Sequence, residues 1–347
     1  MSVAPRVGRT LRSWRAIGAA ALVVGLAVVP PAIGGYVPRA LTSYLIFGLL
    51  ALSVGLISGY GRLFNLGVGA NFGVSAYAVA VLSQYGLTNP LLLLVGALGA
   101  GLMVALLFAF YALVAGGVEY LMLTFLTTLA FAVLPLALPD LLGGDNGLAL
   151  KGGLGVSFGL NPLRGNEFYW LVLAVVVGCA LLSWFVVRSQ AGKAVQAIGR
   201  NPVRAAAMGY SVGGYRVALT LYASLIASLG GWLYVLQNSF VHQDILGLGN
   251  STNGLVYALI GGANTILGPL LGAVVLRFVN DSLSRGSTQS PLYLGIVLML
   301  VVYFLPDGLL GLWDRYGPRR RAAGADRAPQ PPAAAAAGTS AENLEAV

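Results

Sequence analysis

The chain has 347 residues, of which 58% are hydrophobic and only 9% are charged. Charged residues make up about 25% of ordinary soluble domains, so this composition excludes a soluble globular protein and indicates an integral membrane protein. The formal net charge of +9 does not indicate nucleic-acid binding. The basic residues cluster at the ends of apolar segments, and no basic surface with interleaved aromatic residues is evident.

Long apolar runs recur along the chain without the alternating pattern of outer-membrane barrels, and they predict an all-α protein with about ten transmembrane helices. Residues 1–15 are basic and precede the first run in the order of a signal peptide. The small residues of a cleavage site are missing, so we expect an uncleaved first span. The predicted segments are Ala16–Ile33, Leu41–Ser58, Leu63–Ser83, Pro90–Val114, Tyr120–Leu138, Phe168–Val187, Tyr215–Val235, Leu248–Gly262, Leu267–Leu283 and Leu292–Phe304.

Basic residues gather before the first segment, in the loop after the sixth and after the last. With ten crossings all three clusters fall on one side, which the positive-inside rule identifies as cytoplasmic. We therefore expect both termini and loop 188–214 in the cytoplasm, and loop 139–167 outside. Residues 16–317 form one transmembrane domain, whereas the Pro- and Ala-rich residues 318–347 cannot bury a core and are expected to be a disordered cytoplasmic tail. The clusters are Arg6, Arg9, Arg12 and Arg15; Arg188, Lys193, Arg200 and Arg204; and Arg315, Arg319, Arg320 and Arg321.

Two of the predicted segments begin irregularly, with strings rich in Gly and Asn. LGVGANFG at Leu66–Gly73 is similar to LGLGNSTNG at Leu246–Gly254. The topology places the first string at the cytoplasmic side and the second at the external side. This is the arrangement of an inverted repeat, with broken helices in corresponding positions of two halves. Chance similarity between two Gly-rich strings is the alternative.

Four asparagines lie in or beside these strings: Asn65, Asn71, Asn250 and Asn253. Polar amides at the starts of membrane segments need partners or water. We expect these four to line a translocation pathway. The alternative is that they cap the ends of broken helices.

The sequence offers little chemistry for catalysis. One histidine, His242, and one cysteine, Cys179, cannot form a dedicated zinc site, and neither a phosphate-binding loop nor a catalytic triad is evident. We expect no catalytic or metal site and no cofactor in this chain. A proton-driven carrier would need acids or histidines through the membrane interior, and none can be assembled. Arg277 and Asp281, four residues apart, are expected to pair on one helix face near an interface.

The predicted cytoplasmic loop contains the signals of a very short helix. Asn201 followed by Pro202 is typical of an N-cap and a first helical position, and Gly209 is typical of the residue just past a helix end. About seven residues between them would form about 10 Å of helix. A helix of this length is marginal when it stands alone in water.

One long segment, Ser189–Tyr234, resembles the cytoplasmic loop and next span of ABC-importer permeases for branched-chain amino acids, especially their M-type subunit. Its sequence is SQAGKAVQAIGRNPVRAAAMGYSVGGYRVALTLYASLIASLGGWLY. Further similar strings follow the family order: LFNLGVGANFGVSAYAVAVL, LLGGDNGL, LIGGANTILGPLLGAVVL and FLPDGLLGLW. The resemblance extends from Leu41 to Trp313 and implies a permease of the type II ABC importer kind in a bacterial inner membrane.

One departure affects the substrate. The family often has IRENP or IRDNP where this chain has IGRNP at Ile198–Pro202, and some sugar permeases of the same superfamily have Gly-Arg-Asn there. Urea, short amides and sugars are therefore the alternative substrates. An ion-coupled secondary carrier and a membrane-embedded enzyme are the alternatives of other classes.

The resemblance also implies partners. A second permease subunit, a paralogue of this chain, would complete the pathway, two cytoplasmic ATPases would bind ATP, and an external binding protein would deliver substrate. In such permeases the short cytoplasmic helix docks into a cleft of the ATPase, which explains why so short a helix persists here. A helix lying on lipid headgroups is the alternative, although alanines offer it little apolar anchorage. The implied contact residues are Gly199, Arg200, Asn201, Pro202, Arg204, Ala205 and Gly209.

Overall fold

The computed structural model describes residues 36–87, 89–151, 167–286 and Gly295. The predicted first span, most of the last span, residues 1–15 and residues 318–347 lie outside the described residues. The elements in chain order are α2 (Tyr36–Gly55), η1 (Leu56–Tyr60), α3 (Val68–Gln84), α4 (Pro90–Val114), α5 (Val118–Ala137), α6 (Pro139–Leu142), η2 (Gly144–Asn146), β1 (Leu148–Ala149), α7 (Glu167–Arg188), α8 (Gln190–Arg200), α9 (Pro202–Ala207), α10 (Val212–Asn238), β2 (Phe240–Val241), η3 (Gln243–Ile245), α11 (Leu248–Gly261) and α12 (Leu267–Gly286).

Five helices of the described residues are long and apolar enough to cross a membrane: Val37–Tyr60, Pro90–Val114, Val118–Ala137, Glu167–Arg188 and Val212–Asn238. The predicted helical membrane architecture is therefore confirmed, whereas the total of ten spans stays a prediction. The two segments predicted to be irregular form short helices, α3 with 17 residues and α11 with 14 residues. Helices of these lengths extend about 26 Å and about 21 Å, less than the hydrocarbon thickness of about 30 Å.

Helix α2 occupies the centre of the bundle. Its most apolar stretch is 89% buried, against 33% for α4 and α7. Helix α4 instead exposes the large apolar side chains of Met103, Leu106, Phe110 and Leu113. Their spacing of three and four residues puts them on one helix face, so this face is suited to contact lipid.

Helix α10 packs so closely against α3 that the backbones of the two helices are in contact. A Cβ atom on Gly231 would overlap the carbonyl oxygen of Phe72, and one on Gly230 would lie 2.8 Å from the Phe72 ring. The Phe72 ring in turn lies 5.8 Å from the rings of both Phe47 and Tyr234. Small residues that let membrane helices approach closely thus position an aromatic cluster between α2, α3 and α10.

The two Gly- and Asn-rich strings meet inside the bundle, while their expected placement toward opposite sides of the membrane stays a prediction. The backbone N–H of Gly69 donates to Ser251 Oγ at 3.1 Å, and a Cβ on Gly73 would lie 2.9 Å from the carbonyl oxygen of Ile245. The reason is that each helix starts late. Residues 63–67 are not helical and can carry the chain up to about 17 Å before α3 begins.

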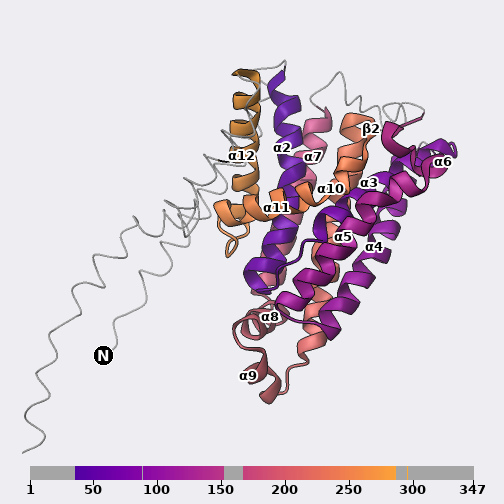
Figure 1. The fold of residues 1–347 in the computed structure, drawn as a ribbon. Coiled ribbons are helices and arrows are strands. Elements are labelled where there is room, and N and C mark those ends of the chain that lie inside the picture. The colour runs from indigo at the N-terminus through magenta and orange to yellow at the C-terminus, as the bar shows by residue number, and fades with distance from the viewer. Residues whose placement is uncertain (1–35, 88, 152–166, 287–294, 296–347) are drawn as a thin grey trace, which may run out of the picture.

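Helix α11 begins only after η3 and a turn that follow β2, and Figure 1 shows it lying across the long helices. The starts of the two short helices therefore lie side by side. An inverted relation between two halves of the chain stays a prediction.

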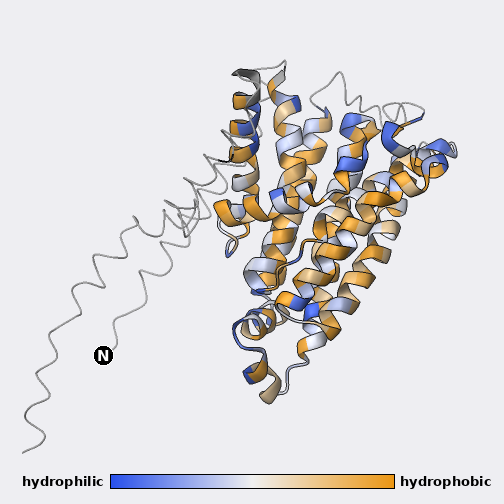
Figure 2. Cartoon of the chain, viewed as in Figure 1, coloured by the Kyte–Doolittle hydropathy of each residue, from blue (hydrophilic) through white to orange (hydrophobic). Residues whose placement is uncertain are grey.

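The predicted loops lie at opposite ends of the bundle. Figure 1 shows α8 and α9 at one end, and α6 and β2 at the other. Strand β1 pairs with β2 antiparallel, with Leu148 opposite Val241. Figure 2 shows polar residues gathered at these two ends and apolar residues between them. This distribution matches a bundle that crosses an apolar layer.

The expected pairing of Arg277 with Asp281 is wrong for the side chains as described. The Asp281 carboxylate accepts a hydrogen bond of 2.7 Å from the Tyr44 hydroxyl, and the Arg277 guanidinium lies 3.5 Å from the centre of the Phe47 ring. Both charges are therefore directed at α2 rather than at each other. Inside a packed bundle, contacts with another helix replace the contact along one helix face that the spacing predicts.

The contact between α10 and α3 yields a test of the fold. We expect Gly231→Leu to destabilise the protein by about 3 kcal/mol or more, the upper end of overpacking costs, because the new side chain would overlap backbone rather than a movable side chain. The measurement is the thermal midpoint and monodisperse yield of the detergent-solubilised protein. The matched control is Gly178→Leu, since a Cβ on Gly178 meets nothing within 4 Å. Equal behaviour of the two variants would refute this packing.

Candidate functional site

The non-helical chain before α3 is held by side chains of α5. The amide of Asn65, which is 2% exposed, donates to the Tyr120 hydroxyl at 2.8 Å and accepts from the backbone N–H of Gly67. The backbone N–H of Leu66 donates to Thr124 Oγ1 at 3.3 Å, and Thr128 Oγ1 donates to the Leu66 carbonyl at 2.9 Å. These bonds replace those that a helix would have made, so the interruption is stable in an apolar bundle.

The roles of Thr124 and Thr128 were not predicted from the sequence. The available signal is a pair of hydroxyl side chains four residues apart in a mainly apolar helix. Such a pair lies on one helix face, and in a membrane it points to a polar partner on a neighbouring segment.

Asn71 links α3 to α10 in the fully buried interior. Its Nδ2 donates to the carbonyl of Ser224 at 2.7 Å and to Ser228 Oγ at 2.9 Å. Its Oδ1 has no partner among the described residues. One acceptor is therefore left inside the bundle, beside the point where α3 meets α11.

The other two predicted asparagines lie on α11. Asn250 is half-buried, and its Nδ2 donates to the carbonyls of Asp244 at 2.9 Å and Ile245 at 3.3 Å. Asn253 is exposed. The four amides thus differ. Asn65 and Asn71 are held inside the bundle, and Asn250 stabilises the turn before α11. The side chain of Asn253 is exposed in this single chain.

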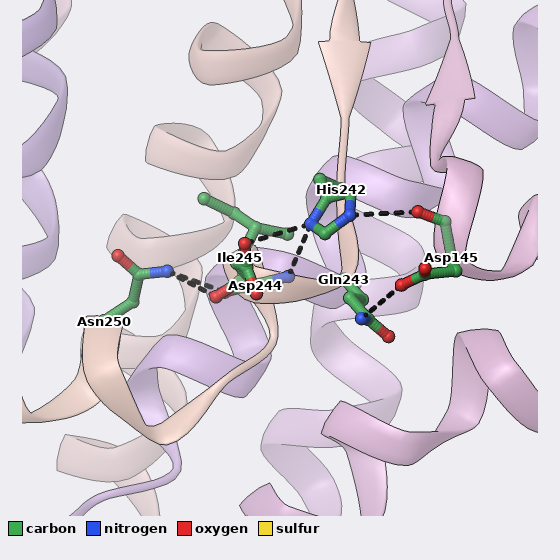
Figure 3. A network of polar contacts seen from close by, with 6 residues as sticks. All are labelled: Asp145, His242, Gln243, Asp244, Ile245 and Asn250. Carbon is green, nitrogen blue, oxygen red and sulfur yellow. Dashed lines mark hydrogen bonds and ion pairs between the residues drawn. The ribbon is translucent and has the colours of Figure 1, made fainter.

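A polar network at the end opposite α9 connects two loops (Figure 3). His242 Nε2 lies 3.0 Å from the carbonyl oxygen of Asp145, and its Nδ1 lies 3.0 Å from the Asp244 carboxylate. Gln243 Nε2 donates to the Asp145 carboxylate at 2.9 Å. Together with Asn250, these contacts tie the loop after α5 to the turn that leads into α11.

The predicted short cytoplasmic helix has the expected local structure. Asn201 is the N-cap of α9, and its Oδ1 accepts from the backbone N–H of Arg204 at 3.0 Å. Pro202 occupies the first helical turn. Gly209 has a φ of +86°, a left-handed conformation that favours glycine. Ala205 is the one fully buried residue of α9 in the described structure, so the rest of this helix is presented outward.

A second helix precedes it, which the sequence reasoning missed. Helix α8 begins at the Ser189 cap, where Ser189 Oγ accepts from the backbone N–H of Gly192 at 3.2 Å. Its buried residues include Ala194 and Ile198, spaced four apart as on one face of an amphipathic helix. That spacing was the available signal.

An open cleft of about 350 Å³ lies between α8 and α9. Three of its lining side chains are the cations Lys193, Arg200 and Arg204, and Met208, which is 66% exposed, lines it as well. Val203, on the same short helix, is 77% exposed. Exposed apolar side chains beside cations are better suited to contact a partner protein than to face solvent.

Of the predicted contact residues, Arg200, Pro202, Arg204 and Gly209 are exposed. Gly199 has a different environment. It packs on the chain after α2, where a Cβ on it would lie 2.9 Å from the carbonyl oxygen of Tyr60. The structure therefore brings Arg200 and Arg204 to one cleft and turns Gly199 toward the membrane bundle. It leaves Pro202 exposed on α9 and Gly209 exposed just past the end of that helix.

Comparison with known proteins agrees with this architecture. Residues 36–306 match the family described as "Branched-chain amino acid transport system / permease component". The high-affinity branched-chain amino acid transport system permease protein LivM of Escherichia coli (strain K12) is 26% identical over 302 residues, which cover 78% of this chain and 68% of that protein.

LivM of Salmonella typhimurium is likewise 26% identical, over 305 residues that cover 78% of this chain and 68% of that protein. The fructose import permease protein FrcC of Rhizobium meliloti is 28% identical over 152 residues, 42% of each chain. No solved structure matches the chain.

The family match covers well over half of the chain, and its helices are suited to a membrane. The resemblance noted from the sequence is thereby confirmed, and the family is one of transport permeases rather than of enzymes. This chain belongs to the family of permease components of branched-chain amino acid transport systems, and it is an ABC-type membrane permease.

Proposed function

We propose that this chain forms the translocation pathway of an ATP-driven importer for branched-chain or related amino acids in a bacterial inner membrane. It works with a second permease subunit, two cytoplasmic ATPases and an external binding protein. Similarity to permeases named for branched-chain amino acids over 78% of the chain supports the substrate class. ATP is bound by the partner subunits, and the permease supplies the path and the coupling contact.

The observation that carries the proposal is helix α9. Six residues cannot stabilise a helix in water, yet this one is capped at both ends and exposes Val203 and Met208. A partner that covers these apolar side chains would supply the missing burial. We propose that the α8–α9 cleft, with Arg200, Asn201, Pro202, Arg204 and Ala205, receives the ATPase.

The meeting point of α3 and α11 supports the pathway part of the proposal. Broken helices with non-helical backbone are tolerated at membrane depth where they line a cavity or are buried in protein. Asn253 and Asn250 are the residues that we assign to the pathway surface, while Asn65 and Asn71 hold its wall. Asn71 Oδ1 has no hydrogen-bond partner among the described residues, so it can accept a hydrogen bond when that wall moves.

Sugar import is the second candidate, because the fructose import permease is 28% identical over 152 residues. Uptake by the complete transporter of labelled leucine, with unlabelled fructose as competitor, separates the two. We expect competition by isoleucine and valine and none by fructose. Uptake that is abolished by an uncoupler while ATP is maintained would instead indicate an ion-coupled carrier.

The arrangement of the two ends predicts the topology. With Cys179→Ser as background, we expect a membrane-impermeant maleimide to label Asn146→Cys on intact cells, because this position lies in the loop after α5 on the external side. Val203→Cys on α9 should react only after permeabilisation. Labelling of both from outside would contradict the orientation.

The coupling role predicts the effect of charge and shape changes in α9. We expect Arg204→Glu to weaken ATPase binding about tenfold, or about 1.4 kcal/mol, and to reduce uptake in parallel. Gly209→Val should also weaken coupling, since a β-branched residue at positive φ costs about 1–3 kcal/mol. The measurements are co-purification of the ATPase and substrate-stimulated ATP hydrolysis.

Two conservative variants serve as controls for these changes. Arg204→Lys keeps the charge, and Gly209→Asn tolerates a left-handed conformation, so both should retain most of the activity. Normal transport and full ATPase retention by Arg204→Glu and Gly209→Val would remove α9 as the coupling element.

The pathway assignment predicts a difference among the asparagines. In the assembled transporter a small thiol reagent should label Asn253→Cys, and substrate should slow this reaction, because Asn253 is exposed. Asn65→Cys should stay unreactive, since Asn65 is buried under α5. Lys151→Cys is the exposed control. A labelling rate at Asn253→Cys that substrate leaves unchanged would count against a pathway position.

A further inference from the structure

Helix α2 ends in an unusual backbone conformation. Its last turn, Leu56–Tyr60, is π-helical, and the backbone N–H of Gly61 continues the wide spacing by donating to the Leu56 carbonyl at 3.3 Å. The next residue, Arg62, has a φ of +50°. A π-turn and a non-glycine residue in the left-handed region are both costly, and such features concentrate at functional sites.

One side of this π-turn contacts the cytoplasmic loop directly. A Cβ on Gly199, in α8, would lie 2.9 Å from the Tyr60 carbonyl oxygen and 3.0 Å from the Gly61 carbonyl oxygen. The backbone of α8 therefore rests on the end of the π-turn with no side chain between them. A displacement of α8 cannot be absorbed there by a rotamer change.

The other side of the π-turn contacts the turn between α11 and α12. A Cβ on Gly59 would overlap the carbonyl oxygen of Ala263, and it would lie 3.2 Å from the backbone nitrogen of Asn264. One turn earlier, a Cβ on Gly55 would lie 2.5 Å from the ring of Pro269. The π-turn thus stands between α8 and the turn that follows the broken helix α11, in backbone contact with both.

We propose that the π-turn Leu56–Tyr60 is the joint that passes movement of the α8–α9 loop to α11. Gly199 and Gly59 are its positioning residues, and the left-handed Arg62 keeps the following chain stiff. The proposal rests on the proposed function, in which the ATPase moves α8 and α9. A π-turn differs from an α-helical turn by one inserted residue, so a return to α-helical spacing would give the joint a second discrete arrangement, as a coupling element requires.

The test uses the complete transporter with Cys179→Ala and a reporter cysteine, Asn264→Cys, at the exposed turn beside Ala263. With the native sequence otherwise, we expect ATP to change the labelling rate of this cysteine. Gly199→Ala should abolish that response and lower uptake about two- to thirtyfold, the range for substitutions along coupling networks. Retention of the ATPase should not change, because Gly199 faces the bundle.

The matched control is Gly178→Ala in α7, where a Cβ meets nothing within 4 Å. It should keep both uptake and the ATP response. If Gly199→Ala also keeps both, the joint is refuted, while loss of ATPase binding in Arg204→Glu would still support the proposed function. If Arg204→Glu leaves ATPase binding unchanged, the proposed function fails instead.

A second pair of variants tests the joint without adding a side-chain atom at a tight contact, as Gly199→Ala does. Arg62→Gly and Arg62→Asn remove the same charge, and both residues accept a positive φ, but glycine is far more flexible. We expect uptake to fall in Arg62→Gly while Arg62→Asn retains most of it, with the ATPase bound in both. Equal uptake in the two variants would attribute any effect to charge and overturn the role of stiffness.

Discussion

The backbone of residues 63–67 leaves the helical path inside an apolar bundle, and its polar groups must be satisfied by protein because lipid offers none. Asn65, Thr124 and Thr128 provide this satisfaction from within the chain. Once the chain is held there, α3 begins at the depth where Ser251 can receive the N–H of Gly69. The contact of α3 with α11, beside which the candidate pathway surface lies, depends on these few hydrogen bonds.

Local chemistry was predicted well from the sequence where it depended on neighbouring residues. The cap at Asn201 and the left-handed end at Gly209 follow from short-range sterics and hydrogen bonding, and the structure has both. The bounds of α4 agree because Asn89 caps it and proline begins it. The membrane class and family were also evident, since composition and motif order do not depend on tertiary contacts.

Contacts between distant segments were not predictable in the same way. The predicted topology placed the two Gly-rich strings toward opposite sides of the membrane, but it did not predict that the starts of α3 and α11 touch each other. Arg277 and Asp281 share a spacing that predicts a pair, yet neighbouring Phe47 and Tyr44 receive them. The π-turn at Leu56–Tyr60 has no sequence signature beyond Gly59 and the flanking Gly55 and Gly61.

Helix α11 is held from two faces of the protein. At its start, Asn250 and the His242 network connect it to the loop after α5, and its far end adjoins Ala263, which touches the π-turn. In terms of thermodynamic linkage, two sites that bias one element must influence each other by the same free energy. Under the proposed joint, a ligand that binds beside the His242 network and shifts α11 would change the affinity at the α8–α9 cleft, and an occupant of that cleft would change the affinity for that ligand by the same factor.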